Sequence, residues 1–348
     1  MHPKIGREFN NETFEMYNEI QSLVLNLNIE IIIKEIIKIK QKNPSTFLGK
    51  GNLLRLKDKI IKYKINLLII NNNLSPSQQR NLEKILNIKV TDRSGIIIEI
   101  FSKRASTKES RLQVELAELI YRKSRLVRAW THLERQRGGT TFIGGPGELQ
   151  IELDKRLIQS KIVRIKKRLV KVKARRKIQR KSRLNSNFQT FALVGYTNAG
   201  KTKLFNKLTK KKQSSQNKLF ETLDTKISKF YLNDHQVGII DTVGFINNIP
   251  TQLIESFHAT LEEINSANFI INVIDVNDIN AHDKILTTKR ILKETGVSED
   301  KISKMINVYN KIDLSNSNYK QTQNRIFISA LTGEGIENLK DSIERKLT

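Results

Sequence analysis

The chain has 348 residues, and its 62 lysines and arginines against 35 aspartates and glutamates give a formal charge of +27 at pH 7. It contains no cysteine, which excludes disulfide scaffolds, thiolate zinc sites and cysteine nucleophiles, and its five histidines are too scattered to suggest a metal site. No apolar run approaches the roughly 20 residues that span a bilayer, and the first residues hold no signal-peptide core. We therefore expect a soluble, cytoplasmic protein without a membrane span.

The first hundred residues alternate short apolar runs with helical patterns. The runs lie at Ile29–Ile39, Ile65–Ile70 and Ile88–Val90, and the helical patterns between them lie at Gly51–Tyr63 and Ser75–Leu86. The pair Ser75-Pro76 is typical of a helix start, because serine caps the first turn and proline there lacks only an N–H that would be unpaired anyway. The alternation predicts an N-terminal α/β domain over residues 1–107 with a small parallel sheet.

Two long helices are predicted next from apolar residues that recur at alternating steps of four and three. They are Leu112, Leu116, Leu119, Leu126, Trp130 and Leu133, interrupted only by Lys123, and then Ile158, Ile162, Ile165, Leu169 and Val172. A sustained heptad pattern needs a facing helix to cover it, so the spacing favours a long antiparallel helical hairpin over residues 108–184. The alternative is that each helix packs separately on a globular core.

A glycine-rich segment joins the two predicted helices. Residues 137–148 contain five glycines and a proline. A turn between helices needs only about two to five residues, so this loop is longer than the geometry demands, and its glycines allow close approach to another surface. We expect the tip loop, residues 138–147, to reach into folded RNA; the alternative is a merely flexible connector.

Positive charge is concentrated in the second of these helices. Residues 155–183 hold 15 basic residues and no acidic one, whereas the chain before them sums to +9 and the chain from residue 187 onward to +3. Such a block repels itself unless a polyanion neutralises it, which favours binding to RNA or DNA over a solvated helical face or a lysine-rich coding bias. The residues expected to contact RNA are Arg137, Gly138, Gly139, Arg164, Lys166, Lys167, Arg168, Arg175 and Arg176.

A phosphate-binding motif opens the last domain, which we expect over residues 187–348. The apolar strand Phe191–Val194 is followed by the G-x-x-x-x-G-K-T sequence and then by the helical run Leu204–Leu208. The motif consists of Gly195, Tyr196, Thr197, Asn198, Ala199, Gly200, Lys201 and Thr202. Backbone N–H groups of such a loop surround phosphates at a helix N-terminus; Lys201 is expected to neutralise the β- and γ-phosphates, and the Thr202 hydroxyl to bind Mg²⁺.

A second motif predicts the remainder of the phosphate and metal site. The strand Val237–Ile240 leads into Asp241, Thr242, Val243 and Gly244, and the preceding segment contains Phe220, Glu221, Thr222 and Leu223. We expect the Asp241 carboxylate to hold Mg²⁺, as such carboxylates usually do through a water molecule, and the Gly244 N–H to approach the γ-phosphate. Thr222 is the predicted switch threonine, which would bind the metal only when the γ-phosphate is present, and Thr225 is its local rival. Lys201, Thr222 and Gly244 are thus the predicted catalytic residues.

One position qualifies the predicted chemistry. Phe245 stands directly after Gly244, where many signalling GTPases carry a glutamine that orients the attacking water. A phenyl ring cannot do so. We therefore expect slow unaided hydrolysis and stimulation by a partner surface, with bound RNA as the natural trigger.

Two further strand ends predict the base that is bound. The strand Met305–Tyr309 runs into Asn310, Lys311, Ile312 and Asp313, and residues 325–328 run into Ser329, Ala330 and Leu331. The Asp313 carboxylate can accept both guanine N1–H and N2–H, which adenine lacks, so it predicts selection of GTP over ATP. The backbone of residues 329–331 can meet guanine O6. Together these elements predict a P-loop GTPase domain with a mostly parallel sheet and helices on both faces.

The chain resembles the HflX family of ribosome-associated GTPases. The matching stretches are Asn73–Glu83, Leu112–Ala117, Gly145–Glu148, Asp241–Ile246 and Pro250–Phe257, which cover all three expected domains. The resemblance implies a factor that binds the large ribosomal subunit and its RNA and splits stalled or idle ribosomes at the expense of GTP. We expect the protein to be monomeric. The family's N-terminal domain is also credited with ATP binding, but residues 1–107 contain no phosphate-binding motif, so this is not carried over.

Two departures from the family pattern concern the hairpin. Gly144 stands where the family usually has an arginine, and residues 155–183 of the second helix include no acidic residue where that helix is normally mixed in charge. Two alternatives to ribosome splitting remain at this point. One is a GTPase that acts in ribosome assembly, and the other is an RNA-binding or remodelling protein whose docking is regulated by nucleotide.

Overall fold

The computed structural model describes residues 1–5, 11–126, 146–184, 189–210, 220, 223–233, 235–246, 262–315, 319 and 325–347. The chain divides into two compact units. One is built mainly from Met1–Lys103 and Leu112–Leu169, and the other from Arg104–Arg111 together with most of the chain after Val170. Within the described ranges, no helix is both long and apolar enough to cross a membrane.

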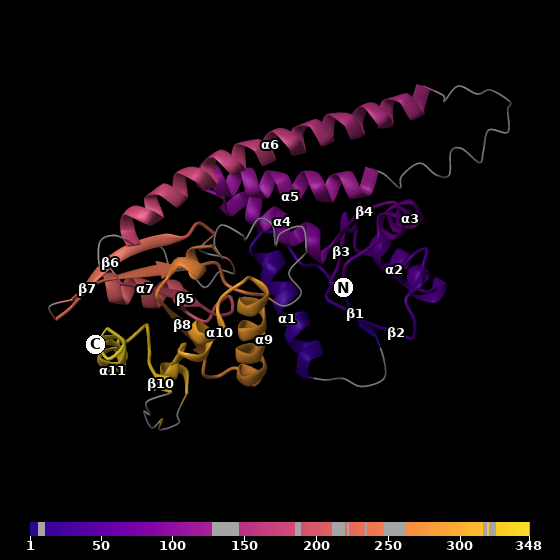
Figure 1. Ribbon diagram of the computed structural model, residues 1–348. Coiled ribbons are helices and arrows are strands. Elements are labelled where there is room, and N and C mark those ends of the chain that lie inside the picture. The colour runs from indigo at the N-terminus through magenta and orange to yellow at the C-terminus, as the bar shows by residue number, and fades with distance from the viewer. Residues whose placement is uncertain are drawn as a thin grey trace. The chain divides into compact units, whose positions relative to one another are not determined.

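The N-terminal region alternates strands and helices (Figure 1). In chain order these are β1 (His2–Ile5), α1 (Asn11–Leu25), β2 (Ile36–Ile39), α2 (Lys50–Lys62), β3 (Leu67–Ile70), α3 (Pro76–Leu86), β4 (Lys89–Asp92) and α4 (Arg93–Arg104). The strands form two parallel pairs, β1 with β2 and β3 with β4, around a core that includes Ile37, Leu82 and Val90. This confirms the predicted α/β class, although the apolar run from Ile29 yields a strand only over its last four residues.

Local capping explains where α3 begins. The Ser75 hydroxyl accepts a hydrogen bond from the Gln78 N–H at 3.1 Å, and the Gln78 side chain accepts one from the Ser75 N–H at 2.9 Å. This reciprocal pair satisfies two N–H groups at the helix start, and Pro76 needs no partner there. The helix therefore starts where the sequence predicts.

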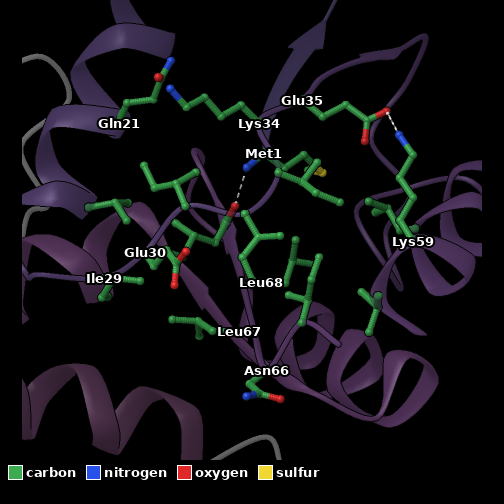
Figure 2. Close-up of a pocket in the computed structure, with 18 of the residues that line it drawn as sticks. Met1, Gln21, Ile29, Glu30, Lys34, Glu35, Lys59, Asn66, Leu67 and Leu68 are labelled. Carbon is green, nitrogen blue, oxygen red and sulfur yellow. Dashed lines mark hydrogen bonds and ion pairs between the residues drawn. The ribbon is translucent and has the colours of Figure 1, made fainter. Parts of the chain in front are cut away.

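A cavity of about 280 Å³ lies within the N-terminal region, between α1, the segment before β2, and β3 (Figure 2). Its walls are mainly aliphatic, with Ile29 and Leu68 among them. Lys59 Nζ lies 3.0 Å from Glu35 Oε1 on its wall, so these two charges are already paired. We assign no function to this cavity.

The predicted helical pair is α5 (Lys108–Leu126) and α6 (Pro146–Leu184) (Figure 1). The seam residues Leu112, Leu116, Ile162, Ile165 and Leu169 are all buried. Lys123, which interrupts the apolar seam, is half-buried, and its Nζ donates to Gln159 Oε1 of α6 at 2.6 Å. Lys123, the polar residue in the apolar heptad pattern, thus joins the two helices by a hydrogen bond. Residues 127–145, which hold most of the predicted tip loop, lie outside the described residues, whereas Pro146 and Gly147, predicted to belong to that loop, begin α6.

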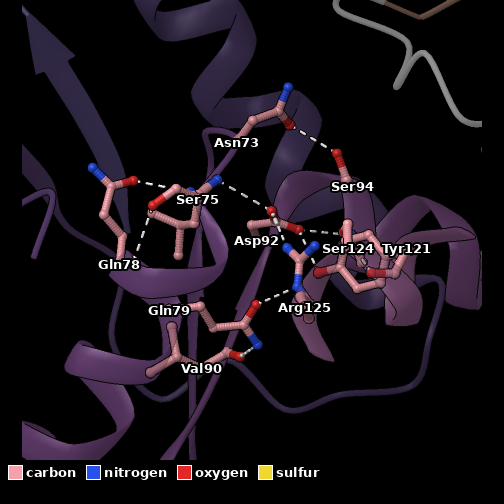
Figure 3. A network of polar contacts seen from close by, with 12 residues as sticks. Asn73, Ser75, Gln78, Gln79, Val90, Asp92, Ser94, Tyr121, Ser124 and Arg125 are labelled. Atoms are coloured by element: carbon pink, nitrogen blue, oxygen red, sulfur yellow. Dashed lines mark hydrogen bonds and ion pairs between the residues drawn. The ribbon is translucent and has the colours of Figure 1, made fainter. Parts of the chain in front are cut away.

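The C-terminal end of α5 is fastened to the N-terminal domain by a polar network around Asp92 (Figure 3). One Asp92 oxygen accepts from Arg125 Nη2 and from the Leu74 N–H, and the other accepts from the Tyr121 hydroxyl and the Gly95 N–H, at distances of 2.8 to 3.1 Å. The Arg125 guanidinium also lies 3.4 Å from the Tyr121 ring centroid. Both oxygens of a carboxylate that is only 2% exposed are therefore satisfied.

We expect Arg125→Ala to lower the free energy of unfolding of the N-terminal region by roughly 3 kcal/mol, because it leaves the buried Asp92 charge without its counter-ion. Urea unfolding followed by circular dichroism measures the change. Arg122→Ala on the same helix is the matched control, since Arg122 forms an exposed ion pair with Glu118 and should change the stability by less than about 1 kcal/mol. Equal losses in the two variants would contradict this account of the network.

The second unit contains a six-stranded sheet in the order β10-β9-β8-β5-β7-β6, in which only β6 runs antiparallel to its neighbour. Its elements are β5 (Thr190–Val194), α7 (Lys201–Thr209), β6 (Lys226–Leu232), β7 (His235–Asp241), β8 (Phe269–Asp275), α9 (Ala281–Glu294), α10 (Glu299–Ser303), β9 (Ile306–Asn310), the 3₁₀ turn η2 (Ile312–Leu314), β10 (Ile326–Phe327) and α11 (Ile336–Glu344). Helices α7 and α11 bury their apolar side chains in one core with β5, β7, β8 and β9. The predicted mostly parallel sheet is thereby confirmed.

Candidate nucleotide-binding site

The predicted site residues gather where the parallel strands β5, β7, β8 and β9 end. In an open α/β sheet the carboxyl ends of parallel strands meet at one edge, where loops and helix N-termini form the ligand crevice. Gly195 follows β5, Asp241 ends β7 and Asn310 ends β9. The structure therefore brings the described parts of the phosphate, metal and base motifs to a single edge of the sheet.

The phosphate loop is shaped by two glycines. Gly195 has φ +137° and packs so closely on β8 that a Cβ would lie 2.2 Å from the Val273 carbonyl oxygen. Gly200 has φ +95° and directly precedes α7, which begins at Lys201. These conformations favour glycine, and they place the loop at the N-terminus of a helix, where backbone N–H groups attract anions. Tyr196 and Thr197 are half-buried, Asn198 is exposed and Ala199 is buried.

Lys201 is held inside the loop. Its Nζ donates to the carbonyl oxygens of Gly195 at 3.0 Å and Tyr196 at 2.7 Å. Burial lowers the pKa of Lys201 from its ordinary 10.5 to about 8, although the Asp241 carboxylate raises it in part. An ammonium that is buried among carbonyl oxygens is well matched to a polyanionic ligand, since phosphate oxygens supply the negative charge that stabilises its protonated form.

Two oxygen ligands of the kind that Mg²⁺ prefers lie side by side. The Thr202 hydroxyl donates to Asp241 Oδ2 at 2.9 Å, and the Asp241 side chain is fully buried at the end of β7. A hydroxyl and a carboxylate fit the hard-oxygen coordination of Mg²⁺. Neighbouring Thr242, predicted to face the nucleotide, donates its hydroxyl at 2.5 Å to the Leu193 carbonyl of β5, so it fixes β7 against the central strand.

The segment after Asp241 is paired with the phosphate loop. The Thr197 N–H donates to the Phe245 carbonyl at 2.8 Å, and the Phe245 N–H donates to the Gly195 carbonyl at 3.0 Å. A Cβ on Gly244 would lie 2.7 Å from Thr197 Cα and 2.9 Å from Lys201 Nζ, so only glycine fits there. Val243 and the Phe245 ring are buried. The sequence marked Phe245 as a residue that cannot orient water, but it did not predict this backbone pairing.

The predicted switch segment is described only in part. Phe220 is buried with φ +55°, and Leu223 and Thr225 are half-buried. Glu221 and Thr222, the preferred switch threonine, lie outside the described residues. The choice between Thr222 and Thr225 therefore stays a prediction.

Asn310 joins the phosphate loop to residues 329–331, which we call the base loop. Its side-chain NH₂ donates to the Ala199 carbonyl at 2.8 Å, and its Oδ1 accepts from the Ala330 N–H at 2.9 Å. The residue is 2% exposed. The Ala330 N–H, one of the backbone groups of residues 329–331 expected to meet guanine O6, therefore donates to Asn310. Asn310 serves in this arrangement as a brace between two loops.

Asp313 is the exposed carboxylate of the base motif. It lies in η2, and its Oδ1 accepts a hydrogen bond from the buried Ser329 hydroxyl at 2.5 Å. Leu331, two positions after Ser329, is 63% exposed. The Ser329 contact fixes one oxygen of Asp313 and so orients the carboxylate, as recognition of a planar base edge requires.

Asp275 and Asn277, which contact Lys311 of the Asn310–Asp313 motif, were not identified from the sequence. Lys311 Nζ lies 2.8 Å from Asp275 Oδ2 at the end of β8, and Asn277 Nδ2 donates to the Lys311 carbonyl at 3.0 Å. Because Asp275 ends a strand that neighbours β9, its position at a strand tip was the available signal. Asp275 and Asn277 together orient Lys311, which was predicted to contact the nucleotide.

The predicted RNA contacts on α6 are exposed where the structure describes them. The exposed cations are Arg164, Lys166, Lys167, Arg168 and Arg175. Arg176 lies in the same helix, but its side chain is outside the described residues, as are Arg137, Gly138 and Gly139. The described cations flank the buried seam residues Ile165 and Leu169, so the same helix packs on one side and presents positive charge on the other.

Three family models match the chain in succession. Residues 15–102 match the N-terminal region of a GTP-binding GTPase, and residues 104–183 match the middle region of the same kind of protein. Residues 190–311 match a family described as 50S ribosome-binding GTPases. Together these matches cover most of the N-terminal region, the helical pair and the nucleotide site as far as Lys311.

Relatives of similar organisation cover nearly the whole chain. A protein from Magnetococcus marinus named GTPase HflX is 41% identical, with 99% of this chain and 80% of the relative aligned. GTPase HflX from Escherichia coli is 37% identical, with 96% and 79% aligned. A crystal structure of a GTP-binding protein from Sulfolobus solfataricus in complex with GDP superimposes with a TM-score of 0.51 at 25% identity, covering 99% of this chain and 98% of that one.

Proposed function

Because the chain belongs to the HflX family of GTPases, we propose that it binds the large ribosomal subunit and uses GTP to split stalled or idle ribosomes. The chain is a P-loop GTPase, as the sequence predicted. We propose in addition that the helical hairpin contacts rRNA and that the two ribosomal subunits separate as a result. We further propose that it acts as a cytoplasmic monomer.

One observation carries the proposal above all. The segment with 15 basic residues and no acidic one is part of a single helix, α6, whose described cations are exposed to solvent except for the half-buried Lys155. A dense row of exposed cations is matched by a polyphosphate backbone, and release of its counterions makes such binding depend steeply on salt. Coupled to a GTPase domain whose family model is that of 50S ribosome-binding GTPases, this favours rRNA as the polyanion.

We assign the chemistry of GTP hydrolysis to residues at the sheet edge. Lys201 and the loop amides stabilise phosphate charge, Gly244 allows its N–H to approach the γ-phosphate, and Asp313 selects guanine. Thr202 and Asp241 would hold Mg²⁺, with Thr222 as a further ligand in the GTP state, and the ion would neutralise charge that develops on the β- and γ-phosphates. The described donors fit that ion because they are two adjacent oxygens, one of them a carboxylate.

The site also supports activation by the partner. The Phe245 side chain is a hydrocarbon ring, so it offers no polar group to a water molecule. The ring is buried, and the Phe245 backbone is bonded to the phosphate loop. Stabilisation supplied in trans is worth roughly 10³ to 10⁵ in rate in GTPases that need it. We propose that the ribosome supplies it, and that hydrolysis then releases the factor.

We also retain the division into three functional parts as a proposal. Residues 1–107 would form the N-terminal domain, residues 108–184 the hairpin that contacts rRNA, and residues 187–348 the GTPase domain. In this division α5 and α6 are the structural link between the ribosome and the nucleotide.

Sucrose-gradient profiles of purified ribosomes test the proposed function. Ribosomes incubated with the protein and a non-hydrolysable GTP analogue are expected to lose joined particles and gain free subunits, whereas GDP should leave the profile unchanged. Unchanged profiles with the analogue would contradict the proposal that the protein splits ribosomes. Binding confined to immature large subunits would instead support the assembly alternative.

Replacing residues 138–147 with a short Gly-Ser linker is expected to leave GTP affinity within about twofold while lowering ribosome-stimulated turnover at least tenfold, because the loop is proposed to contact rRNA and not nucleotide. A nucleotide titration and a phosphate-release assay measure the two quantities. Full stimulation in this variant would identify the loop as a connector only.

A further inference from the structure

The segment that follows the predicted switch threonine is bonded to the start of the hairpin. Asp224 lies two positions after Thr222 and two before β6. Its Oδ2 accepts hydrogen bonds from the Ser106 N–H at 3.1 Å, the Thr107 N–H at 3.0 Å and the Ser106 hydroxyl, and its Oδ1 accepts one from the Thr107 hydroxyl at 2.5 Å. One carboxylate thus accepts four hydrogen bonds from two residues that are more than 100 positions away in the sequence.

These two residues form the N-terminal boundary of α5. The Thr107 hydroxyl accepts from the Ser110 N–H at 3.2 Å, as an N-cap side chain does, and the Arg111 N–H donates to the Thr107 carbonyl at 3.1 Å. The Ser110 hydroxyl returns a bond to the Thr107 carbonyl at 3.0 Å. Asp224 therefore holds the capping residue itself, and a negative charge at a helix N-terminus is further stabilised by the helix dipole.

The Asp224 carboxylate is ionised at physiological pH. Burial raises the pKa of Asp224, but hydrogen bonds from the hydroxyls of Ser106, Thr107 and Ser110 and from the Thr107 N–H outweigh this, so the net pKa lies below the ordinary 3.8. A carboxyl group whose folded pKa is lowered contributes stability above its unfolded pKa and loses it only as the pH falls through the folded value. The contact is therefore intact throughout the pH range in which GTPases act.

The opposite end of α5 is fixed as well. Tyr121 and Arg125 bind the buried Asp92 of the N-terminal domain (Figure 3). Helix α5 thus has one anchor that adjoins the predicted switch segment and another in the N-terminal domain. A helix can transmit displacement along its axis because backbone hydrogen bonds join each turn to the next.

We propose that Asp224 is a positioning residue that couples the nucleotide-dependent position of the switch segment to the N-terminus of α5, and through α5 to the ribosome-contacting hairpin. This rests on the proposed function, since it takes Thr222 as the switch threonine and the hairpin as the rRNA-binding element. It adds a named contact that communicates between them. A shift of the switch segment on GTP binding must either move the capping residues with Asp224 or break four hydrogen bonds.

Amide hydrogen exchange on the full-length protein tests the coupling without the ribosome. In the wild type, protection of the first turn of α5 is expected to differ at least threefold between GDP and a non-hydrolysable GTP analogue. In Asp224→Ala that difference should vanish, while the affinity for both nucleotides stays within about twofold. Thr107→Val, which removes a hydroxyl from the opposite side of the contact, should reduce the difference in the same direction. Asp300→Asn is the matched control, because Asp300 is an exposed carboxylate that pairs with Lys304 on α10.

A second measurement separates this inference from the proposed function. Ribosome-stimulated turnover should fall roughly tenfold in Asp224→Ala, with the loss in kcat at unchanged KM for GTP, and by less than twofold in Asp300→Asn. Wild-type protein that ribosomes do not stimulate would overturn the proposed function. A stimulated wild type with equal turnover in Asp224→Ala, or a nucleotide-dependent α5 in that variant, would overturn the coupling alone. Absence of any nucleotide effect on α5 in the wild type would also overturn it.

Discussion

Asp313→Asn is expected to weaken GTP binding by roughly 10²-fold or more and to create a preference for xanthosine triphosphate. The wild-type carboxylate is expected to accept two guanine N–H groups, and hydrogen bonds to charged groups contribute about 1.5–3 kcal/mol each. The Ser329 hydroxyl donates to Asp313 Oδ1, so in the variant it selects the amide oxygen for that position. The amide NH₂ is then left facing the base, where it repels guanine N2–H and suits the O2 of xanthine.

Competitive titration with GTP, xanthosine triphosphate and ATP measures this change in specificity. Asp300→Asn makes the same chemical change on the exposed surface of α10 and should leave all three affinities within about twofold. A variant that still prefers GTP would contradict the assignment of Asp313 to guanine. Equal weakening of all three nucleotides would indicate a loss of structure in place of a change in specificity.

Gly200→Ala is expected to lower the affinity for GTP and GDP alike by roughly 10²-fold. Gly200 has φ +95°, which costs about 1–2 kcal/mol with a side chain, and a Cβ there would lie 2.1 Å from Asn310 Nδ2. Asn310 cannot yield easily, because it is buried and bonded to both Ala199 and Ala330, and each lost bond costs about 1 kcal/mol. A total of about 3 kcal/mol corresponds to the expected loss.

Gly296→Ala provides a control with the same kind of backbone strain. Gly296 has φ +84°, yet the nearest atom to an added Cβ is Asn265 Nδ2 at 3.9 Å, so the substitution meets strain without collision. It should destabilise the domain slightly and leave nucleotide affinity within about twofold. Isothermal titration with GDP compares the two variants. Similar affinities in both would contradict the role of Asn310 as a brace between the phosphate loop and the base loop.

The sequence predicted most of the GTPase fold because its signals are local. An apolar strand followed by a glycine-rich loop and a helix is readable within about twenty residues, and Asp241 and Asn310 stand at strand ends where the structure places them. The strands of the N-terminal region were harder to predict. Strand β1 is only four residues long and contains Pro3, and α1 was not predicted at all. A short strand with proline shows no alternation, and it forms because β2 is available to pair with it.

The contacts that connect the parts of the chain were not predictable. Asp224 meets Thr107 across 117 positions, and Asp92 meets Arg125 across 33, and neither pair belongs to a repeating pattern. Lys123 was predicted to spoil an apolar seam, but in the structure it bonds to Gln159 on the facing helix. Periodicity shows which face of a helix is buried, whereas the partner of a single polar side chain depends on the tertiary fold.

The most direct test of the account is GTP turnover by the full-length protein with and without purified large ribosomal subunits, measured across a series of salt concentrations. Hydrolysis without ribosomes should be slow and nearly independent of salt. Large subunits should accelerate it by roughly 10³-fold or more at low salt, and the stimulation should fall steeply as salt rises, since α6 is proposed to bind rRNA through many phosphates. Turnover that large subunits leave unchanged at low ionic strength would contradict the claim that rRNA and GTP act on one another through this hairpin.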